Sequence, residues 1–280
     1  MSVKHATAAD GFPIAYEAFG KRDGEPLLLI QGLGADARGW ALQRMSFGRR
    51  YRCFAVDNRG VGGTSGAPHP LSLEQMANDA VAVLDAEGVD AAHVQGASMG
   101  GAIAQIVGVR HPMRVRSLVL ACTACRNPEW RRELLTEWAD GVERDGMAAL
   151  TGEGLRWLVG PRLQRRFGVW LNLMARILLQ ATPENFVAQT RAILDIDDDV
   201  RFELGSIRAP TLVITGTQDL LTPLGDAEEL EELIAGSRLF ELRGAGHSLM
   251  VEAPNAYNRA VVDFLRSCEA DITTPAPAPA

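Results

Sequence analysis

The sequence lacks several features that define particular protein classes. Its four cysteines are too few for a disulfide framework in a chain of 280 residues. No stretch approaches the roughly 18 uncharged apolar residues of a membrane-spanning helix, so we expect none. The opening segment MSVKHATAADGFPIAYEAFG has no apolar run behind a positively charged start. We therefore expect no secretory signal peptide and a cytoplasmic location.

Positive charge is also scarce, and it is almost entirely arginine. The formal net charge is −7, which argues against nucleic acid or an anionic membrane as the main partner. Lys4 and Lys21 are the only lysines among 28 basic residues, a bias typical of GC-rich coding. A small-molecule substrate is the partner we expect, and composition does not bear on the oligomeric state.

What the chain does contain is a series of short apolar runs separated by helical patterns. With 47% hydrophobic residues it can bury a large core as one or two domains. The alternating segment 12–19 predicts an antiparallel strand. Wholly apolar runs of the kind found in parallel sheets follow at 26–31, 52–56, 92–96, 117–121, 210–215 and 238–242. Helical patterns fall between them at 71–87, 99–110, 226–235 and 255–266. This alternation predicts a doubly wound α/β fold.

One long segment interrupts the alternation. Residues 126–205 predict four helices, at 130–146, 152–158, 161–181 and 183–194, and no strand. We expect a helical cap there, flanked by a core of residues 1–125 and 206–272 and followed by a disordered Pro/Ala tail at 273–280. The cap holds most of the tryptophans, which together with Leu171 and Met174 suggest an apolar acyl pocket: Trp130, Trp138, Trp157 and Trp170.

The strongest chemical motif follows the apolar run at 92–96. Residues 96–100 read Gly-Ala-Ser-Met-Gly, a G-x-S-x-G pattern between a strand and a small-residue helix. A serine on such a tight turn has strained backbone angles, and Gly96 and Gly100 remove the side chains that would clash. Ser98 is therefore the candidate nucleophile.

A serine nucleophile needs a base, and only five histidines are available. His5 lies at the N-terminus, which is expected to be frayed, His69 in a Pro-His-Pro loop, and His93 at a strand start facing solvent. His111 lies at a helix C-terminus, where an imidazolium would suit the helix dipole. His247 lies in a glycine-rich loop directly after the 238–242 run, where ligand chemistry occurs in open α/β sheets. We therefore predict that His247 is the base.

The remaining parts of a hydrolytic site lie after other strands. Asp219 follows the 210–215 run and is the predicted acid that orients His247, with Asp226 as the runner-up. The N–H of Met99, next to the serine, is one predicted oxyanion donor, and the N–H of Leu33, after the 26–31 run, is the other.

Taken in order, these motifs resemble those of the α/β-hydrolase-fold superfamily across nearly the whole chain. They are Gln31-Gly-Leu-Gly34, Asp57-Asn-Arg-Gly60 with Gly62, Thr64 and Ser65, Gly96 to Gly100, Gly216 with Asp219 and Pro223, and Gly244-Ala-Gly-His247. The resemblance implies a mainly parallel eight-stranded sheet with helices on both faces and a helical cap after the sixth strand. It also implies the roles above for Ser98, His247, Asp219, Leu33 and Met99.

Two details refine the resemblance. The family usually has His-Gly where this chain has Gln31-Gly32; that His is a structural loop residue, and Gln31 can also hydrogen-bond the loop beside the substrate. Residues 192–219 are loosely similar to 3-oxoadipate enol-lactonases and related small esterases, the serine esterase and lactonase branch.

Other candidate ligands have structural explanations. Cys122 and Cys125 form a C-x-x-C pair without a second cluster, so we expect small pocket-lining residues and no metal site. Arg126 or Arg131 could bind a substrate carboxylate or phosphate, although surface solvation is the ordinary role of such residues.

The sequence thus predicts a cofactor-free serine hydrolase that cleaves a carboxylic ester or lactone through an acyl-enzyme. The substrate is expected to be small and apolar or aromatic. Two alternatives stay open at this point. One is a lyase, eliminase or C–C bond hydrolase on the same scaffold, and the other is a ligand-binding receptor that has kept the fold.

Overall fold

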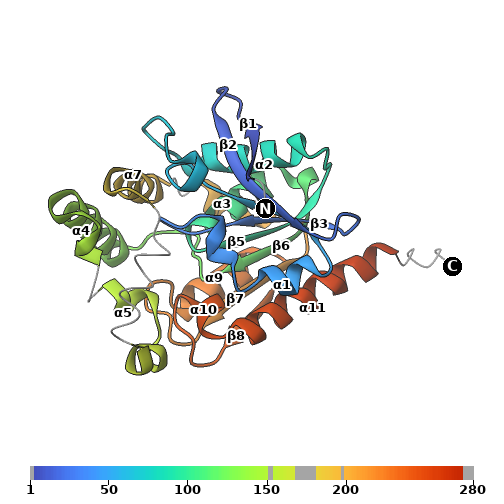
Figure 1. Cartoon of the computed structure of the whole chain (residues 1–280). Coiled ribbons are helices and arrows are strands. Elements are labelled where there is room, and N and C mark those ends of the chain that lie inside the picture. Colours follow the sequence, from blue (N-terminus) through green and yellow to red (C-terminus); the bar gives the residue numbers. More distant parts are fainter. Residues whose placement is uncertain (1–2, 151–153, 168–180, 197–198, 274–280) are drawn as a thin grey trace.

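The structure is a computed structural model that describes residues 3–150, 154–167, 181–196 and 199–273. Its centre is one eight-stranded sheet with the strand order β1-β2-β4-β3-β5-β6-β7-β8 (Figure 1). Strand β2 is antiparallel to both of its neighbours, and all later pairs are parallel. The strands are β1 (Val3–Thr7), β2 (Pro13–Gly20), β3 (Pro26–Ile30), β4 (Arg52–Val56), β5 (Ala92–Ala97), β6 (Val115–Ala121), β7 (Thr211–Gly216) and β8 (Arg238–Leu242). This confirms the predicted fold class.

Helices cover both faces of the sheet because the central strands are apolar on both sides. In β3, Leu28 and Ile30 belong to one buried cluster and Leu27 and Leu29 to the other. The first cluster packs against α2 (Leu73–Ala86), α3 (Met99–Arg110) and α9 (Leu224–Leu233). The second packs against α1 (Arg44–Gly48), α10 (Leu249–Glu252) and α11 (Pro254–Thr273). No helix in the described ranges is both long enough and apolar enough to cross a membrane.

Capping residues mark the N-termini of two helices, α2 and α7. Ser72 precedes α2 and its hydroxyl accepts the N–H of Gln75, which satisfies a donor that the first turn would leave free. Thr182 caps the N-terminus of α7 (Pro183–Leu194) in the same way, with Pro183 as the first helical residue. Both helices lie within two residues of their predicted bounds.

The helical segment, which we define as residues 126–205, connects β6 to β7. It contains α4 (Glu129–Asp145), α5 (Gly154–Leu158), a helical stretch at 161–167, α7 and α8 (Asp199–Glu203). Figure 1 shows α4, α5 and α7 grouped on one side of the sheet. Helices α4 and α7 pack through Val142 and Phe186, among other buried residues. Residues 168–180, which include most of the helix predicted at 161–181, lie outside the described residues.

The structure corrects some predictions at the two ends of the chain. Residues near the N-terminus form the edge strand β1, so His5 is part of the sheet and not a frayed end. Helix α11 runs to Thr273, seven residues beyond its predicted end at 266. Thr273 is therefore helical and not part of a tail, while 274–280 lie outside the described residues.

Candidate active site

Ser98 lies on a sharp turn between β5 and α3. Its backbone has φ 54° and ψ −121°, a left-handed conformation that non-glycine residues rarely adopt. The turn leaves no room for a side chain two positions before or two positions after Ser98. A Cβ at Gly96 would lie 2.0 Å from the carbonyl oxygen of Gly100, and one at Gly100 would lie 2.2 Å from that of Ile30. The two glycines are therefore required by close backbone approach, as the motif predicts.

The structure brings Ser98, His247 and Asp219 together in one hydrogen-bonded chain. The Nε2 of His247 is 2.9 Å from the Oγ of Ser98. The Nδ1 of the same ring is 2.9 Å from the Oδ2 of Asp219. The three residues follow β5, β8 and β7, whose carboxyl ends lie at one edge of the sheet. Both His247 and Asp219 are buried.

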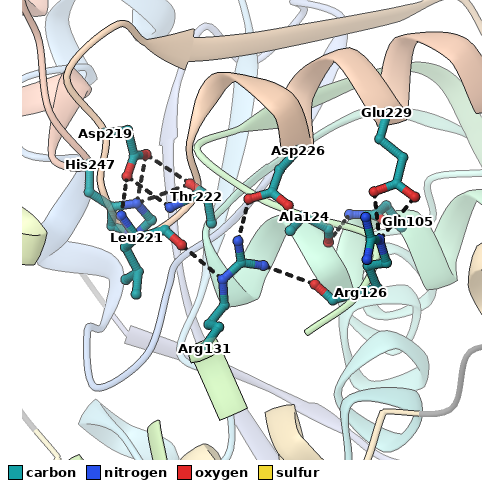
Figure 2. A network of polar contacts seen from close by, with 10 residues as sticks. All are labelled: Gln105, Ala124, Arg126, Arg131, Asp219, Leu221, Thr222, Asp226, Glu229 and His247. Carbon is teal, nitrogen blue, oxygen red and sulfur yellow. Dashed lines mark hydrogen bonds and ion pairs between the residues drawn. The ribbon is translucent and has the colours of Figure 1, made fainter. Parts of the chain in front are cut away.

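The Asp219 carboxylate is held by its own loop (Figure 2). Its Oδ1 accepts the backbone N–H groups of Leu221 and Thr222, both at 2.9 Å. Its Oδ2 accepts the hydroxyl of Thr222 at 2.8 Å as well as contacting His247. Thr222 was not singled out from the sequence; its only signal is its place just before Pro223 at the start of α9. Asp226, the runner-up acid, lies in the first turn of α9 and forms an ion pair with Arg131 instead.

The loop after β3 carries the predicted oxyanion donor. Gly32 lies against the nucleophile, since a Cβ there would be 3.1 Å from the Cβ of Ser98. The N–H of Gly32 donates to the side chain of Gln31, and that of Gly34 donates to Gln189. The N–H of Leu33, between them, has no acceptor among the described residues. The N–H of Met99 in the first turn of α3 is likewise free of an intrahelical acceptor.

Gln31 has a clear structural function in this loop. Its side chain is buried, and its Oε1 accepts the N–H of Gly32 at 3.0 Å. Its Nε2 lies 3.8 Å from the sulfur of Met250. A Cβ at Gly39 would come within 2.3 Å of that nitrogen, so glycine makes room for the amide. Gln31 thus hydrogen-bonds the loop as expected and also lines the cavity described next.

A cavity of about 240 Å³ opens onto Ser98 and His247. Its walls are mostly apolar and come from both the sheet and the helical segment. Trp138 and Cys122 are among the residues that line it. Trp130 and Trp157 are not among the residues that line it; their rings stack on each other, 6.0 Å apart, and Trp130 is 40% exposed. Trp170, Leu171 and Met174 lie outside the described residues.

The prediction for Trp130 and Trp157 was therefore wrong for a geometric reason. Helical spacing shows that Trp130 and Trp138 are eight residues apart on α4, but not which surface each one meets. Trp138 turns toward the cavity, while Trp130 joins α4 to α5 at the outer side.

Of the two arginines considered in the helical segment, Arg131 differs from the expected surface role and Arg126 does not (Figure 2). Arg131 is buried, its Nε donates to the carbonyl oxygen of Leu221 at 2.8 Å, and its Nη1 donates to that of Arg126 at 2.9 Å. Its Nη2 pairs with Asp226. Arg126 is half exposed and pairs with Glu229 at 2.8 Å. Both arginines line the cavity, but the donors of Arg131 are already used by the protein.

These pairs set the charge state of the carboxylates around α9. Burial raises the pKa of Asp226, although the adjacent Arg131 opposes the shift. Burial also acts to raise the pKa of Glu229, but hydrogen bonds from Arg126 and Arg201 outweigh it and leave that pKa below its usual range. The ion pairs with Arg126 and Arg201 thus favour the negative charge of Glu229 in its partly buried position.

The cysteines of the C-x-x-C pair are free thiols in the cavity wall. Burial raises the pKa of Cys122 well above its usual value and that of Cys125 to about 12. Both are therefore protonated at neutral pH and poor nucleophiles. In the described ranges, no group of three or more His, Cys, Asp or Glu residues could hold a metal ion.

The other histidines lie away from the reacting groups. His93 is wholly buried rather than facing solvent; its Nδ1 is 2.8 Å from the hydroxyl of Ser117, and burial lowers its pKa to about 4. His111 does follow α3, but burial and the nearby Arg114 lower its pKa, so a dipole-stabilised imidazolium is not favoured. His69 contacts Asn185 at 3.0 Å.

Glu252 is a further residue that sequence reasoning missed. Its Oε1 accepts the N–H of Gly246, adjacent to His247, and the N–H of Gly160 in the helical segment. The N–H of Ser248 donates to the carbonyl oxygen of Leu158 at 2.8 Å. The loop that carries His247 is therefore fastened to the helical segment.

Known proteins share this architecture. A family model described as the alpha/beta hydrolase fold matches residues 25–254. The chain is 29% identical over 261 residues to 3-oxoadipate enol-lactonase 2 of Acinetobacter baylyi, across 92% of this chain and 95% of the relative. The solved enol-lactonase from Burkholderia xenovorans LB400 has a TM-score of 0.86 at 29% identity, across 94% of this chain and 100% of that one. A thermophilic esterase from Thermogutta terrifontis has a TM-score of 0.86 at 25% identity, across 96% and 99%. With the strand order, the turn at Ser98 and a family match over most of its length, this chain belongs to the alpha/beta hydrolase fold family.

Proposed function

We propose that this protein is a serine hydrolase that cleaves a carboxylic ester or lactone with a small apolar or aromatic acyl group. The observation that carries the proposal is the chain from Ser98 through His247 to Asp219, with both contacts at 2.9 Å, opening onto an apolar cavity. A nucleophile in contact with a base, and a base in contact with a third orienting group, is the arrangement that nucleophilic catalysis needs.

Each residue has one task in the proposed reaction. His247 Nε2 takes the proton of Ser98 as Oγ forms a bond to the substrate carbonyl carbon. The negative charge that develops on the carbonyl oxygen accepts hydrogen bonds from the N–H groups of Leu33 and Met99. The C–O bond of the ester then breaks, and the leaving alkoxide takes the proton from His247. In a lactone the alkoxide stays attached to the acyl chain.

Water completes the cycle. His247 removes a proton from a water molecule, whose oxygen attacks the acyl carbon, and the bond to Ser98 Oγ breaks as that oxygen is reprotonated. Asp219, held by its loop, keeps the ring in the tautomer that accepts at Nε2. No step consumes a cofactor.

The cavity and the relatives support the substrate class. A volume of about 240 Å³ lies just below the usual range for ligand pockets, which favours a small acyl group. Sequence and structural relatives named as enol-lactonases and an esterase point to the same chemistry. We also propose that the helical segment is the cap that shapes this pocket over the core formed by residues 1–125 and 206–272.

A fluorophosphonate probe and short p-nitrophenyl esters test the proposal. The wild type should be labelled and should hydrolyse the esters, and Ser98→Ala should abolish both. Ser248→Ala is the matched control, because it removes another serine hydroxyl in the cavity wall and should still be labelled. A wild type that neither reacts with the probe nor hydrolyses any ester or lactone would overturn the proposal.

A further inference from the structure

Among the described arginines of the helical segment, Arg131 is the most deeply buried, with 3% of its surface exposed. A buried guanidinium is costly unless its donors find partners. Here each nitrogen of the guanidinium has a partner: Nε meets Leu221, Nη1 meets Arg126 and Nη2 meets Asp226. Two of these partners belong to the core, Leu221 in the loop after β7 and Asp226 at the start of α9, while Arg126 lies in the connection after β6 (Figure 2). Arg131 therefore joins α4 to the segments that surround Asp219.

The contact with Leu221 reaches the candidate acid through one residue. The carbonyl oxygen of Leu221 accepts from Arg131 at 2.8 Å, and its N–H donates to the Oδ1 of Asp219 at 2.9 Å. The partner on the other side, Asp226, lies just beyond the end of the same loop. The guanidinium thus holds the loop between Asp219 and Asp226 at two points.

We propose that Arg131 is a positioning residue for Asp219, so that docking of α4 on the core fixes the angle at which the carboxylate meets His247. The proposal rests on the function proposed above. It differs from the substrate-binding role considered for Arg131, because all three sides of its guanidinium are engaged by protein atoms. It also differs from a purely structural ion pair, because one of its contacts leads directly to the acid.

The neighbouring Arg132 provides a matched control. It lies on the same helix, is exposed, and also donates to a carbonyl oxygen, that of Leu194 at 2.9 Å in α7. It does not line the cavity and does not contact the loop that carries Asp219. Replacing it should affect the packing of the helical segment without affecting the acid.

The experiment compares Arg131→Met, the double variant Arg131→Met/Asp226→Asn, and Arg132→Met. The double variant removes the unpaired buried carboxylate that Arg131→Met alone would leave. For each variant, kcat and KM for a p-nitrophenyl ester are measured from pH 5 to 9 together with the thermal midpoint. The low-field proton signal of a His247 ring bonded to Asp219 is recorded as a readout that needs no turnover.

We expect Arg131→Met to lower kcat by about 10²-fold, the effect of a small misplacement of a catalytic group. KM should change by less than about 3-fold, since the direct contacts to substrate remain. The double variant should regain thermal stability but not kcat, and Arg132→Met should keep kcat within about 3-fold.

Recovery of kcat in the double variant would overturn the proposal, because the role would then be that of an ion pair alone. A change confined to KM would also overturn it in favour of substrate binding. If the wild type itself fails to react with the probe or the esters, the proposed function fails. In that case the low-field signal still decides the role of Arg131, since its loss in Arg131→Met supports positioning and its retention contradicts it.

Discussion

The sheet core and the helical segment contribute to the same cavity by different means. In the core, the backbone itself places Ser98 and the candidate oxyanion donors, which lie where strands end. In the helical segment, side chains provide the wall, through Trp138, and the fastening, through Arg131. The candidate catalytic groups are therefore positioned by local backbone geometry. The shape of the pocket, in contrast, depends on how the helical segment packs against the core.

The two regions are also joined at defined points and not merely stacked. Arg131 fastens the segment to the loop of Asp219, and Glu252 with Ser248 fastens it to the loop of His247. Both loops that follow β7 and β8 are thus braced by the same neighbour. A change in the segment is therefore expected to affect turnover where it touches these points and binding where it lines the cavity.

The largest effect should come from the core. Asp219→Asn should lower kcat by about 10⁴-fold with the fold intact, by analogy with serine proteases, because the amide favours the wrong tautomer of His247. Steady-state kinetics and circular dichroism check both parts of this expectation. A variant that retained more than a tenth of the wild-type kcat would assign the acid to another carboxylate.

The loss of stability that histidine protonation causes at acidic pH should also arise in the core, because no histidine occurs in the helical segment. His93 has a pKa of about 4 in the fold against about 6.5 when unfolded. The unfolded chain therefore gains a proton first, and stability falls as the pH drops from about 6.5 to 4. The full contribution is about 3 kcal/mol.

Urea unfolding at pH 7.5 and pH 5 measures this effect. His93→Gln should unfold with a smaller difference between the two pH values than the wild type. His5→Gln, at an exposed position of β1, is the control for replacing a histidine outside the buried core. Equal pH dependence in the wild type and His93→Gln would contradict the assignment.

A smaller effect is expected where the two regions meet at Glu252. Glu252→Leu removes the acceptor of the Gly246 and Gly160 amides and should lower kcat on the order of 10-fold through movement of the His247 loop. Glu252→Gln keeps an acceptor oxygen and should retain most of the activity. If both variants lost the same activity, the charge of Glu252, and not its hydrogen bonds, would be the property that matters.

The smallest effect should separate two tryptophans of α4. Trp138→Ala should raise KM by about 10-fold for aromatic or branched acyl esters, because it removes apolar surface from the cavity wall. Trp130→Ala should leave KM unchanged and lower only the thermal midpoint, since its ring contacts Trp157. Equal KM values for the two variants would contradict the difference between the inner and outer sides of α4.

Much of the core could be predicted because its signals are local. The apolar runs of β3 to β8 match the strands to within two residues at each end. In β3 to β7, burial on both faces requires such runs. The turn at Ser98 needs two glycines within five residues, and α7 carries both of its start signals in adjacent residues. The edge strand β1 escaped prediction because four of its five residues are exposed and show no apolar pattern.

The sequence by itself determined the elements, the nucleophile turn and the order of Ser98, Asp219 and His247, since each depends on a few neighbouring residues. Only the tertiary structure decided that Arg131 meets a carboxylate 95 residues away, that His93 is buried, and that Trp138 rather than Trp130 faces the cavity. Helical and strand periodicity define which residues share a face, but not what that face packs against. That is settled when the helical segment folds onto the sheet.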